Sequence, residues 1–141
     1  MIRSGSAVWQ GNLREGKGTV STESGVLRGS PYSFGSRFES APATNPEELI
    51  AAAHAACFSM ALSLQLQTAG FTAERIETTA KVTLEKLEAG FTITASHLTL
   101  TAKVPGAKPE EFAKIAEGAK AGCIVSRALN AAISLDATLL S

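Results

Sequence analysis

The hydrophobic pattern divides the chain into a strand-rich start, a long apolar helix and a mixed remainder. Short strands are predicted in the first forty residues, at 7–9, 16–22 and 33–39. In the third stretch Phe34 and Phe38 alternate with polar residues, so both side chains should lie on one face of a strand. The N-terminal part is therefore expected to form three strands joined by turns.

A helix start follows the loop after the third stretch. Asn45 is a suitable N-cap, and Pro46 suits the first helical position. The helix should run to about Thr68, because Gly70 lies where a helix typically stops. Residues 49–66 are apolar almost all round, which predicts burial on most sides. The length approaches that of a membrane span, but the polar interruptions and the strand-rich remainder favour a central core helix.

Two alternating strands then predict a β-hairpin. Apolar residues occupy even positions from Ile76 to Leu84, and the chain turns at 89–90. After this turn the apolar residues change phase near 96–97. One extra residue exchanges the two faces of a strand, so this change predicts a β-bulge.

A second helix and a final strand complete the pattern. The helix should begin at Pro109 and weaken at Gly122, after which Cys123 starts a further helical segment to Leu129. Residues 133–139 alternate as a last strand. Strands and helices in this order predict an α+β fold with a mostly antiparallel sheet.

The length predicts one domain spanning residues 1–141. A helix that is apolar all round needs cover on more than one side, and a single sheet from one chain would leave one side open. A second copy of the chain would supply the missing cover. The sequence therefore predicts a homodimer.

Charge and composition narrow the classes of partner. Thirteen basic residues balance thirteen acidic ones, which argues against a nucleic-acid or membrane-surface partner held by bulk charge. The first residues lack the apolar stretch of a secretory signal, so a reducing cytoplasm is the expected location. In that compartment two cysteines are more often free, reactive or metal-bound than a structural bridge.

The two cysteines have different local contexts. Cys57 lies in mid-helix, where a small buried hydrophobe is the ordinary interpretation. His54, one turn earlier, could favour its thiolate or could be a hydrogen-bonded core histidine. Cys123 precedes a predicted helical segment, whose free N–H groups favour a thiolate, although core packing explains it equally well.

Five longer stretches of the chain have recognisable sequences: residues 18–27, 34–39, 44–49, 52–62 and 119–126. They resemble segments of the OsmC/Ohr family, the osmotically inducible and organic hydroperoxide resistance proteins, and the first two look like the OsmC branch in particular. The likeness spans nearly the whole chain, but Ile124 stands where the family usually has proline.

The resemblance implies a thiol-dependent peroxidase that reduces organic hydroperoxides to alcohols. It implies an intertwined homodimer in which mostly antiparallel sheets wrap long central helices, and an external dithiol reductant in place of any metal or cofactor. By position, Cys57 matches the peroxidatic cysteine and Cys123 the resolving one, which form an intramolecular disulfide through a sulfenic acid. Arg37 matches the arginine that stabilises the thiolate and binds the peroxide, and Glu47 matches the glutamate that holds this arginine.

Helix geometry constrains such a site. Glu47 precedes Cys57 by ten residues, which in a straight helix is a rise of about 15 Å. A glutamate serving that cysteine must therefore arrive through a kink or from a partner subunit. An interface site in a dimer satisfies this condition.

Three other interpretations remain open from the residues. The chain could be a non-catalytic, stress-related dimeric module that binds a small apolar ligand, with both thiols as packing residues. A zinc site could use His54, Cys57, His97 and Cys123. A cysteine hydrolase could pair Cys57 with His54.

Overall fold

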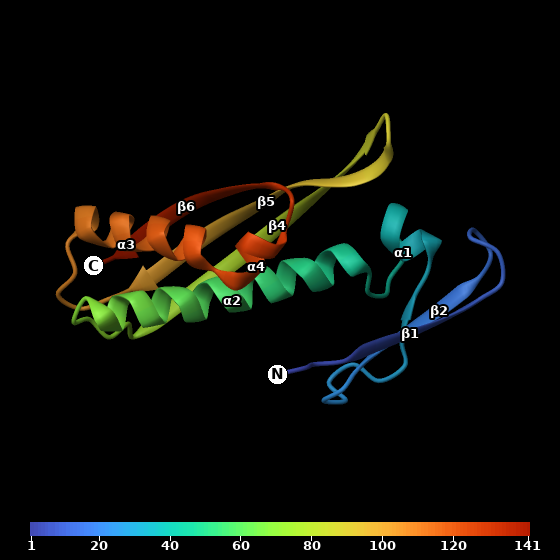
Figure 1. The fold of residues 1–141 in the computed structure, drawn as a ribbon, viewed down its shortest axis with the longest axis horizontal. Coiled ribbons are helices and arrows are strands. Elements are labelled where there is room, and N and C mark those ends of the chain that lie inside the picture. Colours follow the sequence, from blue (N-terminus) through green and yellow to red (C-terminus); the bar gives the residue numbers. More distant parts are fainter. The chain divides into compact units, whose positions relative to one another are not determined.

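The chain forms two compact units, residues 1–49 and residues 50–141, in a computed structural model that describes residues 1–141 (Figure 1). Each unit has its own sheet. The single sheet expected from the sequence is therefore wrong, because the N-terminal strands pair among themselves and not with the later hairpin. One domain over the whole chain stays a prediction.

The first unit is a three-stranded antiparallel sheet followed by a short helix. Strands β1 (Gly5–Gln10), β2 (Lys17–Thr22) and β3 (Ser30–Tyr32) pair in the order β1-β2-β3. Helix α1 (Phe34–Phe38) follows directly. The first two predicted strands are confirmed by β1 and β2.

The predicted strand at 33–39 is wrong, because this stretch forms α1. Ser33 and Ser36 close a capping box: the Ser36 N–H donates to Ser33 Oγ (3.1 Å), and the Ser33 N–H donates to Ser36 Oγ (2.9 Å). Phe34 and Phe38 still lie on one face, with ring centroids 5.0 Å apart. A spacing of four residues fits one face of a helix as well as of a strand, so alternation alone could not separate the two.

The second unit places three helical segments and a mixed sheet around one core. In the sheet order β4-β5-β6, β4 and β5 form an antiparallel hairpin and β6 runs parallel to β5. A parallel neighbour needs a crossover, which the last two helices provide. The α+β prediction is confirmed. Its elements are α2 (Pro46–Thr68, which begins at the end of the first unit), β4 (Arg75–Leu87), β5 (Gly90–Lys103), α3 (Pro109–Gly122), α4 (Ile124–Ala128) and β6 (Ala132–Leu140).

The start of α2 agrees with the sequence. The Glu48 N–H donates to Asn45 Oδ1 at 2.8 Å, which is the contact of an N-cap side chain. The helix ends at Thr68, and Gly70 follows with a positive φ of 91°. By length and hydropathy alone α2 could also cross a bilayer, a test that core helices of soluble proteins pass as well.

The β-bulge lies slightly earlier than predicted. Thr83 pairs with Ala95 and Leu84 pairs with Ile93, so Thr94 is the extra residue. The sequence placed the bulge near 96–97. An apolar pattern shows that the phase has changed, but the backbone pairing determines which residue is left over.

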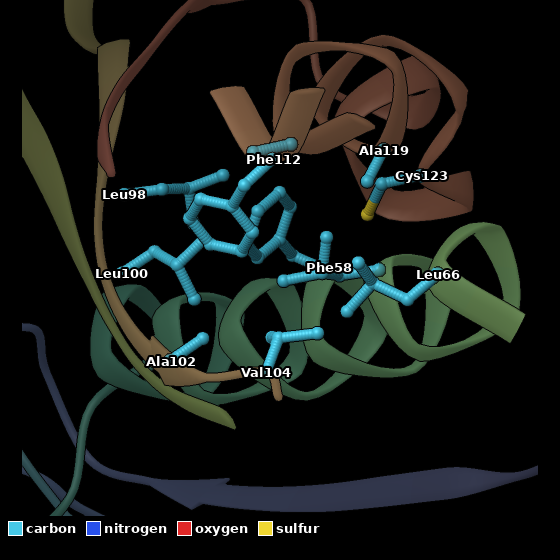
Figure 2. Close-up of a cluster of buried hydrophobic side chains, with 11 residues drawn as sticks. Phe58, Leu66, Leu98, Leu100, Ala102, Val104, Phe112, Ala119 and Cys123 are labelled. Carbon is cyan, nitrogen blue, oxygen red and sulfur yellow. The ribbon is translucent and has the colours of Figure 1, made fainter. Parts of the chain in front are cut away.

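The core of the second unit lies where α2 and α3 pack on β5 (Figure 2). Every fourth residue of α2 faces inward, and so does every second residue of β5. Only one stripe of α2 is covered within the chain, whereas burial on most sides was expected: Met60 and Leu64 are 76% and 64% exposed. The buried residues are His54, Phe58, Leu62 and Leu66 from α2, Ser96, Leu98, Leu100 and Ala102 from β5, Val104 just after β5, Phe112, Ala116 and Ala119 from α3, and Cys123 between α3 and α4.

Candidate functional site

Cys57 lies at the edge of the covered stripe of α2. It is half-buried and packs against the core one residue before the fully buried Phe58. Cys57 also borders a hollow of about 590 Å³, lined by apolar side chains and a glycine. The thiol is therefore reachable from an apolar surface. The residues around this hollow are Cys57, Met60, Ala61, Leu64, Gly122 and Ile124.

Cys123 lies at the break between α3 and α4. Its backbone has φ −55° and ψ 129°, its N–H donates to Ala119 O at 2.9 Å, and its carbonyl accepts from the Arg127 N–H at 3.0 Å. The residue thus ends one helix and caps the next, which confirms the predicted break. Its side chain is 1% exposed, and Figure 2 shows the sulfur pointing from this break toward α2.

The fold brings the two thiols together. The Cys57 and Cys123 side chains lie close enough for each to shift the pKa of the other, and both cysteines are free. Residues that are far apart in the sequence meet here because α2 and the α3–α4 break pack on the same core. Two adjacent thiols can be joined by a two-electron oxidation that forms one S–S bond and releases two protons.

Burial raises the pKa of the Cys57 thiol, and the neighbouring Cys123 sulfur adds to this rise. The backbone N–H groups of Val125 and Ile124 donate to the Cys57 sulfur and oppose the rise without cancelling it. Ile124 can do this because it carries an N–H, which proline lacks.

The balance at Cys123 has the opposite sign. Burial disfavours its thiolate, but the hydrogen bonds to the sulfur outweigh burial and lower the pKa of Cys123. The Ser126 N–H is the strongest of these donors, followed by the Cys57 thiol, the Ser126 hydroxyl and the Val125 N–H.

Arg37 and Glu47 form a two-point ion pair within the first unit. The Arg37 Nε donates to both carboxylate oxygens (3.0 and 3.3 Å), and Nη2 donates to Oε1 at 2.8 Å. The Glu47 side chain is 12% exposed and that of Arg37 is 40% exposed. Such a fork fixes the guanidinium plane, and the exposed part of Arg37 remains able to meet another group.

Short-range contacts hold this ion pair in place. The Ser36 hydroxyl donates to Thr44 O at 2.8 Å, and Asn45 Nδ2 donates to Ser36 O at 3.0 Å. Asn45 therefore caps α2 and also ties it to α1, which carries the arginine. The four residues predicted from the resemblance thus occur as two pairs, Arg37 with Glu47 in the first unit and the two cysteines in the second.

A buried hydrogen-bond network beside the thiols was not predicted. His54 is fully buried, and its Nδ1 and Nε2 lie 2.7 Å from Ser96 Oγ and 2.7 Å from Ser126 Oγ. Burial lowers the pKa of His54, which keeps the imidazole neutral. A hydrogen-bonded core histidine was one of the two interpretations that the sequence left open for His54, but single serines carry no signal that would have named its partners.

The zinc site and the cysteine hydrolase left open by the sequence each require an arrangement of side chains that this structure does not contain. No group of three or more His, Cys, Asp and Glu side chains that could hold a metal ion occurs in residues 1–141. Both ring nitrogens of His54 are already bonded to hydroxyls and neither is bonded to Cys57. A zinc site and a Cys57–His54 hydrolase pair therefore have no supporting geometry.

Residues 38–138 match the family described as OsmC-like protein, and the chain belongs to this family. It is 57% identical over 139 residues to "Peroxiredoxin OsmC" of Escherichia coli (strain K12), covering 99% of this chain and 97% of that protein.

Two further comparisons extend this relationship. The chain is 38% identical over 99 residues to "Organic hydroperoxide resistance protein OhrA" of Bacillus subtilis (strain 168), covering 69% and 66% of the two chains. A solved organic hydroperoxide resistance protein from Elizabethkingia anophelis aligns with a TM-score of 0.68 and 28% identity, covering 99% and 96%. These relationships make the chain an enzyme of the peroxidase type.

The contact between the sulfurs predicts that mild oxidation joins them within one chain. Diamide treatment of the folded protein should remove two thiols per chain and leave a peptide linked through Cys57 and Cys123, detected by non-reducing peptide mapping. In Cys123→Ser the linked peptide should be absent. Two titratable thiols that persist in the treated native protein, or bonds only between chains, would contradict the contact.

Proposed function

We propose that this enzyme reduces organic hydroperoxides to alcohols, with Cys57 as the attacking thiolate and Cys123 as the resolving thiol. The observation that carries the proposal is the contact between two free thiols beside an apolar hollow. Relatives named for peroxiredoxin activity and for organic hydroperoxide resistance support it. A redox-inert apolar binding module would have no need for adjacent thiols.

In this mechanism the Cys57 thiolate attacks the terminal oxygen of the peroxide. The O–O bond breaks, the alkoxide takes up a proton to become the alcohol, and Cys57 becomes a sulfenic acid. Cys123 then attacks the sulfenic sulfur, the S–O bond breaks and water leaves. An external dithiol reduces the resulting disulfide by thiol–disulfide exchange, and no step requires a metal or an organic cofactor.

Apolar alkyl or lipid peroxides are the substrates that this surface would favour. Met60, Leu64 and Ile124 border the hollow beside Cys57 and are 76%, 64% and 74% exposed. Burying an alkyl chain against such side chains is favourable by roughly 25 cal/mol for each Å² of apolar surface removed from water. Hydrogen peroxide has no apolar surface and would gain none of this.

Arg37 supplies the positive charge that the mechanism needs at Cys57. The groups around Cys57 in residues 50–141 raise its pKa, so another charge must favour its thiolate. A guanidinium that Glu47 holds at two points is a fixed cation with little freedom to turn away. The same cation would orient the polar end of the peroxide.

A homodimer would complete this arrangement. Ten residues of straight helix separate Glu47 from Cys57, about 15 Å of rise, so the ion pair that serves one Cys57 would come from a second chain. The exposed apolar side of α2 also requires cover. Sedimentation equilibrium should give twice the mass of one chain at micromolar concentration, and a single-chain mass there would remove this part of the proposal.

The two cysteines should fail in different ways when replaced. Cys57→Ser should lose consumption of cumene hydroperoxide, because no sulfenic acid can form. Cys123→Ser should consume about one peroxide per site and then stall, because the sulfenic acid has no resolving partner. Peroxide consumption in a ferrous–xylenol orange assay, with a dithiol in excess, measures both. Normal turnover by Cys57→Ser would refute the mechanism.

Replacing the arginine should act on the acidity of Cys57. In a Cys123→Ser background, Arg37→Ala should raise the Cys57 pKa, measured as the pH dependence of iodoacetamide alkylation, since a stabilising charge is lost. Peroxide attack at neutral pH should slow for the same reason. Arg3→Ala, which removes an exposed arginine, is the matched control. An identical alkylation profile in Arg37→Ala and Arg3→Ala would exclude the assigned role.

A further inference from the structure

The covered stripe of α2 has one polar end. His54 continues the four-residue spacing of Phe58, Leu62 and Leu66, and it is as fully buried as they are. It faces Ser96, which continues the inward alternation of β5 and is also fully buried. An imidazole in such a core gains little stability over an apolar side chain, because its hydrogen bonds mainly replace those to water.

The polar network continues from His54 to the resolving cysteine. Nε2 of His54 lies 2.7 Å from Ser126 Oγ. Ser126 also lies three residues after Cys123, which caps α4 and is 1% exposed, and hydrogen bonding from Ser126 lowers the pKa of the Cys123 thiol. Hydrogen bonds therefore join Ser96, His54 and Ser126, and this series ends one helical turn from Cys123.

An ionised Cys123 would fix the direction of this series. Ser126 has one hydroxyl proton, and a thiolate can only accept. If that proton is on the sulfur side, Ser126 Oγ must accept from the His54 Nε2–H, and Nδ1 must then accept from the Ser96 hydroxyl. A neutral imidazole offers one donor and one acceptor and fits this arrangement without a change of charge.

We propose that His54 and Ser126 are positioning residues that orient the Ser126 hydroxyl toward the Cys123 sulfur and stabilise its thiolate for the resolution step. The proposal rests on the function proposed above. In this arrangement Ser96 donates to His54, His54 donates to Ser126, and Ser126 donates toward Cys123. Each group that accepts a hydrogen bond thereby becomes a stronger donor for the next one. Neither His54 nor Ser126 touches the peroxide or the reacting oxygen.

The resolution step does not require His54, Ser96 or Ser126 to gain or lose a proton. The Cys123 thiolate gives an electron pair to the sulfenic sulfur of Cys57, an S–S bond forms and the S–O bond breaks. Hydroxide leaves and combines with the proton released by Cys123 to give water. Cys123 is oxidised and the sulfenic sulfur is reduced, while His54 remains neutral throughout.

Few titratable groups face the Cys123 sulfur. The Cys57 thiol on α2 donates to it directly, and His54 on the same helix lies one hydroxyl away. The neighbouring position on β5 is the uncharged Ser96, and the remaining donors are N–H groups of α4. No charged side chain is among the groups that shift the pKa of Cys123, so hydrogen bonding is its main support.

The test uses reduced protein in which Cys123 is the single thiol. In a Cys57→Ser background, the rate of iodoacetamide alkylation is measured against pH. Ser126→Ala and His54→Leu should each move the profile to higher pH, because a donor to the thiolate is lost or misdirected. Ser126→Thr keeps a hydroxyl and should therefore have the alkylation profile of the background. His54→Gln should have a profile between those of the background and His54→Leu, because an amide can both donate and accept a hydrogen bond.

His97 offers the matched histidine control. It follows Ser96 on β5, faces the opposite side of the sheet, and bonds to Ser134 and Asp136. His97→Gln should leave the alkylation profile unchanged. An unshifted profile in Ser126→Ala, or a shift in Ser126→Ala with none in His54→Leu, overturns the role of His54. Circular dichroism checks that each variant is folded. If His54→Leu does not fold, His54→Gln replaces it in the comparison with Ser126→Ala.

A second readout addresses the reaction itself. With both cysteines present, Ser126→Ala should form the Cys57 sulfenic acid at the parent rate, followed by dimedone trapping. Disulfide formation after one equivalent of cumene hydroperoxide should be about three- to tenfold slower. Equal disulfide rates would overturn the proposal. If Cys57→Ser still consumed peroxide, the proposed function would fail, but the further inference would not. The alkylation profile needs no peroxide, so it would still show whether His54 and Ser126 stabilise the Cys123 thiolate.

Discussion

The packing of one stripe of α2 on the inward side of β5 is the contact on which the site depends. Four-residue spacing on the helix meets two-residue spacing on the strand, and α3 closes the core from the other side. This arrangement fixes the rotation of α2, and with it the direction of Cys57. The same core holds the α3–α4 break that carries Cys123. The thiols therefore meet as a consequence of core packing and need no dedicated linker.

The two sulfurs share a location but not an electrostatic environment. Cys57 lies in the middle of a long helix, where the nearby backbone N–H groups are engaged in helical hydrogen bonds. The two backbone groups that lower its pKa, those of Ile124 and Val125, belong to α4. Cys123 caps α4 and is served by N–H groups of that helix and by a hydroxyl. In the proposed mechanism Cys57 is the attacking thiol, and its thiolate would need a cation such as Arg37 from another chain. An interface between two chains would then have a chemical role.

Much of the fold could be predicted from local pattern. The Asn45 cap, the extent of α2, the hairpin and the helix break at Cys123 follow from residues close in sequence. Residues 33–39 were predicted as a strand because alternation and helical spacing coincide at Phe34 and Phe38, and only the serine capping box decides between them. The parallel pairing of β6 also needed the structure, since strand direction depends on the crossover.

The candidate site was predictable where a motif carried it and not elsewhere. The resemblance named Arg37, Glu47 and both cysteines, but nothing local pointed to the serines on either side of His54. Those contacts join residues that are 42 and 72 positions apart. Hydrogen bonds over such separations exist only once the core has packed, so a sequence pattern cannot indicate them.

The position of the thiols also links the redox cycle to the thermodynamics of folding. A bond between the middle of α2 and the α3–α4 break would close a loop of about 66 residues, which lowers the entropy of the unfolded chain and is worth roughly 4 kcal/mol. By a closed thermodynamic cycle, the folded disulfide would be harder to reduce than an unstrained one in the unfolded chain, by on the order of 90 mV. In the proposed cycle, the dithiol that reduces this bond would have to be a stronger reductant than the thiols alone would require.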